Sequence, residues 1–125
     1  MATQTRSIEV IHKTDITEAV RLTITIGNLQ IGGSSVKWET DKEPLKIGPI
    51  YDLYLGPGNS ILDKVLLIET RFFDRNENTN NVSAMYDFNN GKEPIHVFYD
   101  AVKNEKDFFI FKLKVTFKNE AHENI

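Results

Sequence analysis

The sequence contains no cysteine, which excludes disulfide bonds, thiolate metal sites and cysteine nucleophiles. Long hydrophobic runs are also absent. No apolar run is longer than Val65-Leu66-Leu67-Ile68, far below the ~20 residues that a membrane-spanning helix needs. The polar start of the chain is not followed by an apolar stretch of signal-peptide length. We therefore expect a cytoplasmic protein without a membrane span, with leaderless export as the open alternative.

A surplus of positive charge is missing as well. The chain has 15 Lys and Arg residues against 18 Asp and Glu residues, which gives a net charge of -3. Proteins that bind nucleic acid usually gather basic residues on one face, so we predict no nucleic-acid partner. With 125 residues, 40% hydrophobic and 26% charged, the chain has the length and composition of one ordinary globular domain.

Motifs for catalysis or metal binding are sparse. His12, His96 and His122 are far apart in the sequence, and none has a second ligand at a metal-binding spacing. No G-x-S-x-G turn surrounds a serine. We expect His96 to face solvent, because its neighbours Ile95 and Val97 are apolar and neighbouring strand residues point to opposite faces. The sequence thus predicts a non-enzymatic protein that needs no cofactor.

Alternation of apolar and polar residues is the main signal that is present. In residues 111–118, Phe and aliphatic residues alternate with Lys112, Lys114, Thr116 and Lys118, as in a strand with one buried face. Residues 20–26 repeat this pattern. Six further strands are predicted over residues 7–12, 35–39, 49–55, 64–73, 82–88 and 95–99.

Turn-forming residues separate these segments, in particular Gly56-Pro57-Gly58-Asn59 and Asn89-Asn90-Gly91. About eight strands with such turns, and at most one or two short helical turns, predict an all-β fold. We expect a single-domain antiparallel β-sandwich over residues 1–125, of jelly-roll or Ig/C2-like type. Residues 1–6 and 119–125 are predicted to be polar terminal segments.

The aromatic residues are unevenly placed, because all eight phenylalanines fall between Phe72 and Phe117. Two pairs are adjacent: Phe72 with Phe73, and Phe108 with Phe109. Neighbouring residues of a strand point to opposite faces, so each pair sends one ring to each side of its sheet. We expect most of these rings to fill the core, and any ring on an uncovered face to contact a partner.

The segment of residues 74–81 is unusually rich in Asp and Asn. Asp74, Asn76 and Asn78 alternate like the first ligands of a calcium-binding loop. The rest of an EF-hand loop is missing, since Thr79 takes the place of its glycine and Met85 that of its final glutamate. An Asn-rich connection between strands is the simpler interpretation. A calcium-dependent or carbohydrate-binding sandwich is the alternative function that this segment supports.

The leading hypothesis is a protein–protein interaction or structural module, as a subunit of a homo-oligomer or of a larger assembly. The first strand and the segment from Phe108 to Lys118 are predicted to be edge strands, which can pair with a protein partner or with a second copy. The predicted interaction residues are Phe108, Phe109, Lys112, Lys114 and Lys118. Lysines on a strand face also protect sheet edges from aggregation, so they do not by themselves identify a partner.

A small hydrolase or isomerase is a third class of function. It would need a pocket in which carboxylates such as Asp52, Glu69 or Asp87 have raised pKa values. Glu69 is the most notable of these, because it interrupts an apolar segment. The simpler interpretation is that Glu69 faces solvent or pairs with a nearby Lys or Arg.

Overall fold

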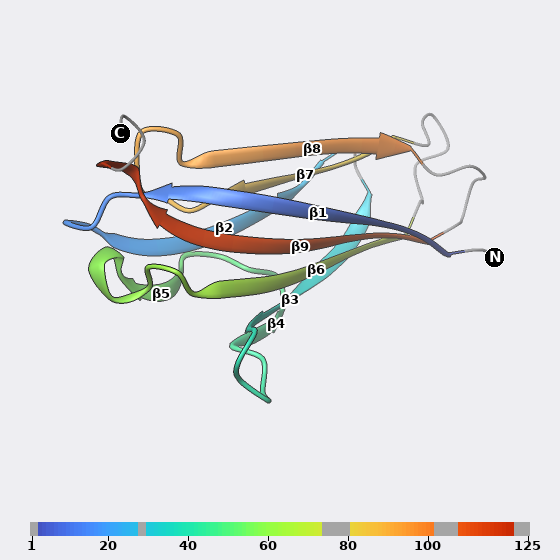
Figure 1. Ribbon diagram of the computed structural model, residues 1–125. Helices are drawn as coiled ribbons and strands as arrows, with labels where there is room; N and C mark the ends of the chain where they lie inside the picture. The colour runs from blue at the N-terminus through green and yellow to red at the C-terminus, as the bar shows by residue number, and fades with distance from the viewer. Residues whose placement is uncertain (1–2, 28–29, 74–80, 102–107, 122–125) are drawn as a thin grey trace.

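The computed structural model describes residues 3–27, 30–73, 81–101 and 108–121, and within them it forms nine strands in two sheets (Figure 1). A single turn of 3-10 helix, Gly58–Ser60, follows the fifth strand. No helix in this part of the chain is long and apolar enough to cross a membrane. The strands are β1 (Thr3–Thr14), β2 (Ala19–Ile26), β3 (Ile31–Trp38), β4 (Lys46–Gly48), β5 (Leu53–Pro57), β6 (Val65–Phe73), β7 (Asn81–Asp87), β8 (Ile95–Ala101) and β9 (Phe108–Asn119).

The first sheet has the strand order β1-β9-β6-β3-β4, and the second has the order β5-β2-β7-β8. All pairs are antiparallel except β1 with β9, which is parallel and runs from Thr3 opposite Phe108 to Thr14 opposite Asn119. The prediction of a wholly antiparallel architecture is therefore wrong for this pair. A parallel pair needs a long connection between its strands, and here the whole of β2 to β8 lies between them.

Strand β9 lies in the interior of its sheet, between β1 and β6. The prediction that the segment from Phe108 to Lys118 is an edge strand is therefore wrong, whereas β1 is an edge strand as predicted. The lysines of β9 project from the outer face of the sheet, so they do not protect an open edge from pairing with another strand. The alternation that predicted the strand is confirmed, because Leu113 and Val115 are buried while Lys112 and Lys114 are exposed.

The two sheets pack their inner faces against one hydrophobic cluster. From β9 the buried side chains alternate along the strand, and β2 contributes Val20 and Leu22, both fully buried. The adjacent phenylalanines divide between the two faces as predicted. Phe72 and Phe109 are buried, whereas the rings of Phe73 and Phe108 meet on the outer face with their centroids 5.0 Å apart.

The predicted strand over residues 49–55 is split. Gly48 and Asp52 both have positive φ, of 116° and 50°, so the chain turns sharply at each and leaves β4 before it enters β5. Between these turns the Ile50 side chain is buried, and its carbonyl oxygen accepts a hydrogen bond from the Ile24 backbone N–H at 3.0 Å. The segment therefore connects the two sheets instead of continuing one strand.

A buried polar contact also ties the sheets together. The Tyr86 hydroxyl of β7 donates to Thr70 Oγ1 of β6 at 2.7 Å, and Ser34 Oγ of β3 lies 2.8 Å from the same Thr70 oxygen. All three side chains are buried. Burial raises the pKa of Tyr86, so its hydroxyl stays protonated and keeps its role as the donor. Thr70 thus serves as the shared partner of two other hydroxyls.

We predict that Thr70→Val destabilises the fold more than Tyr86→Phe does. Valine has nearly the shape of threonine but leaves the Ser34 and Tyr86 hydroxyls buried without a partner, at a cost of about 3 kcal/mol. Phenylalanine at position 86 removes one donor and leaves the Ser34–Thr70 hydrogen bond intact, at a cost of about 1 kcal/mol. Urea denaturation of both variants measures the difference. Equal losses of stability would show that Thr70 is not the shared partner.

Candidate functional site

The structure brings two of the histidines together. His12 of β1 is fully buried, and its Nδ1 lies 3.0 Å from Nε2 of His96 on β8, so the pair links the two sheets. The His12 ring packs on Phe88 with 4.7 Å between centroids, and on Phe117 at 5.8 Å. The prediction that His96 faces solvent is wrong. Its ring points inward and is half-buried.

Burial and, to a smaller extent, the neighbouring His96 together lower the pKa of His12 to about 4, while Asn90 opposes the shift. Burial also lowers the pKa of His96, against the opposing charge of Glu93. Both rings are therefore neutral at pH 7. His12 has no exposed surface, and its Nε2 has no hydrogen-bond partner among the described residues. The His12 ring is inaccessible from outside, and the pair forms a contact between β1 and β8.

The inward position of His96 has a second consequence, because the neighbouring apolar residues then face outward. Ile95, Val97 and Tyr99 of β8 are 46%, 37% and 69% exposed, and Met85 of β7, opposite Val97, is 37% exposed. We call these four residues the β8 patch. The alternation in β8 is thus real but reversed relative to the expectation, with the aliphatic side chains on the outer face.

Strand β8 is an edge strand of the second sheet, along one border of the molecule in Figure 1. The Phe88 backbone N–H donates to the Pro94 carbonyl at 2.9 Å, and the register places Tyr86 opposite His96. Antiparallel hydrogen bonds recur at every second residue, so the residues at even positions of β8 bond to β7. The backbone N–H and C=O groups of Ile95, Val97 and Tyr99 consequently point to the open edge.

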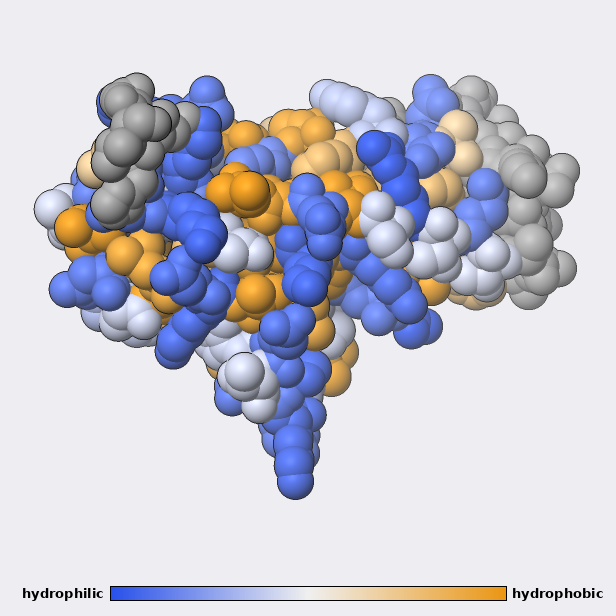
Figure 2. All heavy atoms as spheres, in the orientation of Figure 1, coloured by the Kyte–Doolittle hydropathy of each residue, from blue (hydrophilic) through white to orange (hydrophobic). Residues whose placement is uncertain are grey.

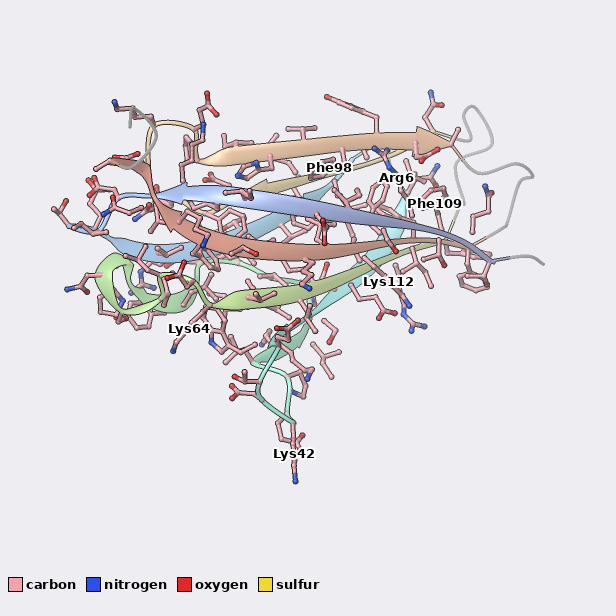
Figure 3. The ribbon with its side chains drawn as sticks, in the orientation of Figure 1. Arg6, Lys42, Lys64, Phe98, Phe109 and Lys112 are labelled. Atoms are coloured by element: carbon pink, nitrogen blue, oxygen red, sulfur yellow. The ribbon has the colours of Figure 1, made fainter. Side chains whose placement is uncertain are left out.

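One end of this edge is covered by Arg6 of β1. Its guanidinium donates to the Tyr99 carbonyl oxygen at 3.0 Å and lies 3.5 Å from the Asp100 carboxylate, beneath β8 (Figure 3). The contact agrees with a Tyr99 carbonyl that points to the open edge, away from β7. Both Arg6 and Asp100 are more than a third exposed, so their ion pair is weak.

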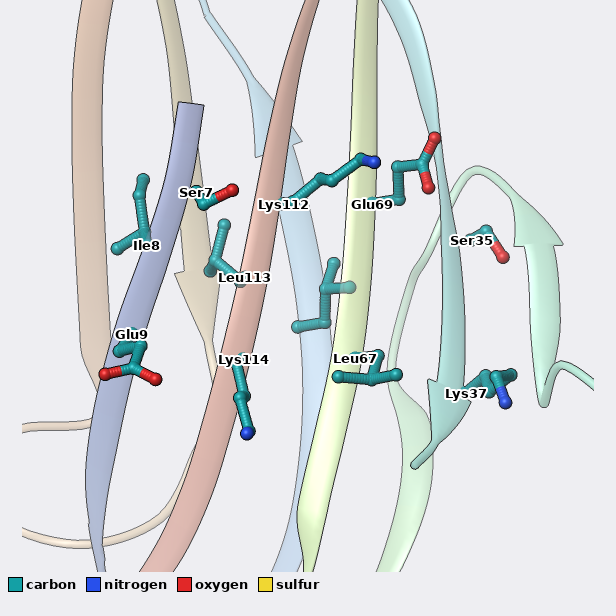
Figure 4. Close-up of a pocket in the computed structure, with 11 residues that line it drawn as sticks. Ser7, Ile8, Glu9, Ser35, Lys37, Leu67, Glu69, Lys112, Leu113 and Lys114 are labelled. Atoms are coloured by element: carbon teal, nitrogen blue, oxygen red, sulfur yellow. The ribbon is translucent and has the colours of Figure 1, made fainter. Parts of the chain in front are cut away.

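A second surface feature is a groove of about 560 Å³ on the outer face of the first sheet, across β1, β9, β6 and β3 (Figure 4). The register places Lys112 beside Glu69 and Lys114 beside Leu67. Hydrophilic and hydrophobic side chains are interspersed over this side of the molecule (Figure 2). The groove is open and combines charges of both signs, so it does not select one class of ligand.

The predicted interaction residues therefore have different environments. Lys112 and Lys114 line the groove, whereas Lys118 pairs with Asp63 at 2.6 Å. Phe108 is 39% exposed and Phe109 belongs to the core. Phe108, Lys112, Lys114 and Lys118 share the outer face of β9, and only Phe109 points into the core. The sequence did not predict the β8 patch, because Ile95 and Val97 were assigned to the core. The one sign of an edge strand in the sequence was the position of residues 95–101 between Pro94 and a charged segment.

The carboxylates considered for an enzyme site do not form a cluster in the structure. Glu69 lies on the outer face and accepts from Arg71 at 2.7 Å, as the simpler interpretation held. Asp52 lies 3.4 Å from Arg21, and Asp87 accepts from the Asn89 backbone N–H at 2.8 Å. Asp74, Asn76 and Asn78 lie outside the described residues. Within residues 3–27, 30–73, 81–101 and 108–121, no three His, Asp or Glu side chains are placed to share a metal ion.

Comparison with known proteins identifies no family for this chain. No protein-family model, no curated protein and no solved structure matches it.

The buried histidine pair predicts that the fold loses stability in mild acid. In the unfolded chain a histidine takes up a proton below pH 6.5, whereas folded His12 does so only near pH 4. The folded state therefore loses up to about 3 kcal/mol between these two values and keeps its full stability above pH 6.5. Urea denaturation at pH 7, 5.5 and 4 measures the loss. The variant His12→Phe retains the ring packing and should lose less over the same range. Parallel pH profiles for the two proteins would contradict the assignment.

Proposed function

We propose that this chain is a non-enzymatic protein-interaction module that binds an extended protein segment along the open edge of β8. The observation that supports the proposal is an edge strand that directs the backbone groups of Ile95, Val97 and Tyr99 to its open edge and their side chains to the outer face. Strand addition of this kind takes its affinity from backbone hydrogen bonds and its selectivity from alternate side chains. An exposed apolar edge strand is otherwise a liability that proteins avoid.

The other three sheet edges are less suited to such binding. β4 has three residues and ends at the positive φ of Gly48. β5 has an irregular register against β2 and contains Gly56 and Pro57. β1 is long, but it carries the charged side chains of Arg6, Glu9 and Lys13, which discourage pairing. Of the edge strands that the structure describes, β8 alone has seven residues or more, a regular register with its neighbour and a row of large apolar side chains that point outward.

Several features accompany this proposal. We propose that the two packed sheets form one β-sandwich domain, of jelly-roll or Ig/C2-like type, and that the protein acts in the cytoplasm. Its role is that of a subunit in an assembly with protein partners. The alternative, a calcium-dependent or carbohydrate-binding function of residues 74–81, remains a prediction from the sequence alone.

The proposal is tested by selecting linear peptides that bind the protein from a displayed random library. We expect the selected peptides to bind along β8, and Val97→Pro to weaken their binding by roughly tenfold or more. Proline removes the N–H at the centre of the open edge, and it is tolerated on edge strands. Val97→Thr retains the N–H and the β-branched shape, and serves as the matched control.

Isothermal titration of a selected peptide with the three proteins provides the measurement. Thermal melting of each variant verifies that its fold is intact. Peptides that bind the Val97→Pro protein as tightly as the original would place the docking site elsewhere and contradict the proposal.

A further inference from the structure

We propose that the strand that occupies the β8 edge is β8 of a second copy of this chain, in an antiparallel arrangement around a twofold axis at Val97. This inference rests on the proposed function and adds the identity of the partner and its register. It follows from the pattern of β8 itself, which presents a large exposed side chain on each side of Val97, namely Ile95 and Tyr99.

Self-pairing requires that the strand match its own reverse. With the axis at Val97, each Val97 faces the Val97 of the other copy, and each Ile95 faces a Tyr99. All of these side chains are apolar and lie on the outer face, where Met85 extends the same surface onto β7. An interface in which one surface meets its own copy is the usual arrangement of a symmetric dimer.

The backbone agrees with this register. The residues at odd positions of β8 direct their N–H and C=O groups to the open edge, as the pairing of the even positions with β7 requires. A twofold axis at Val97 makes the two copies of this residue a hydrogen-bonded pair, and Ile95 and Tyr99 form the next pairs on either side. The second sheet of each copy would then continue into the other across the axis.

Charge does not oppose the arrangement. The one charged side chain of β8, Asp100, lies at the end of the strand and is already paired with Arg6. The Arg6 guanidinium already donates a hydrogen bond to the Tyr99 carbonyl oxygen. In the dimer this oxygen must either accept a second hydrogen bond, from the Ile95 N–H of the other copy, or lose its contact with Arg6. Both alternatives are accessible, since a carbonyl oxygen accepts two hydrogen bonds and the Arg6 contact is exposed.

The size of the contact fixes how strong such a dimer is. One strand of seven residues and four outward side chains form a contact at the lower end of the range for specific interfaces. We therefore expect a dimer that assembles in the micromolar range and dissociates on dilution, instead of an obligate one.

The test uses opposite charges at the axis. In this register Val97→Lys places two lysines side by side, and Val97→Glu places two glutamates side by side, so each variant alone should dimerise at least about tenfold more weakly. A mixture of the two variants places a lysine beside a glutamate and should restore the dimer. Sedimentation velocity measures the association of each protein, and native mass spectrometry identifies the mixed dimer by its mass.

Thr25→Lys and Thr25→Glu are the matched controls, because Thr25 is exposed on β2 of the same sheet, and β7 separates β2 from β8. These variants should dimerise like the original protein. A protein that stays monomeric up to millimolar concentration would overturn the proposal, as would a Val97→Lys protein that dimerises normally or a mixture that does not recover. If self-association fails while selected peptides still bind at Val97, the interaction module remains and only its partner is wrong. If neither occurs, both proposals fall.

Discussion

The pairing of β9 on both of its sides is the constraint on which the rest of the structure depends. This strand holds β1 along its whole length on one side and β6 on the other, and its inward residues form a continuous part of the core. Because β1 carries His12 and Arg6, its position on β9 also determines what meets β8 across the space between the sheets. The histidine pair and the Arg6–Asp100 contact therefore both depend on the β1–β9 register.

The same arrangement explains why β8 differs from the other strands. Among the described strands it forms a ladder of backbone hydrogen bonds with β7 alone, and its inner face carries the half-buried side chains of His96 and Phe98. Since His96 and Phe98 point inward, their neighbours Ile95 and Val97 must point outward. The exposed apolar surface is thus the counterpart of the buried histidine pair. Because the even-numbered residues of β8 point inward and the odd-numbered residues point outward, the strand contributes His96 to the buried pair and Ile95, Val97 and Tyr99 to the exposed surface.

Much of this fold follows from local pattern, and the exceptions have identifiable causes. Alternation located β2 and β9 because their polar residues are charged or hydroxylic and their other residues are apolar, which leaves one possible core face. In β8 both sets contain rings, so alternation identified a strand but could not tell which face is buried. The parallel pairing of β1 with β9 depends on contacts between distant segments, and no local pattern reports them. The approach of His12 to His96 depends on that same pairing, so it was equally hidden.

The parallel pair also bears on the order in which the molecule assembles. Residues 3–14 leave the ribosome about a hundred residues before residues 108–119, the strand against which they pair. Until β9 has been synthesised, β1 has no neighbour in its sheet and β6 has one unpaired side, so two strands with apolar faces remain open throughout most of translation. Contacts of such large separation along the chain also slow folding in general. The first sheet therefore cannot close before residues 108–119 emerge, and until then the apolar faces of β1 and β6 are open to other strands.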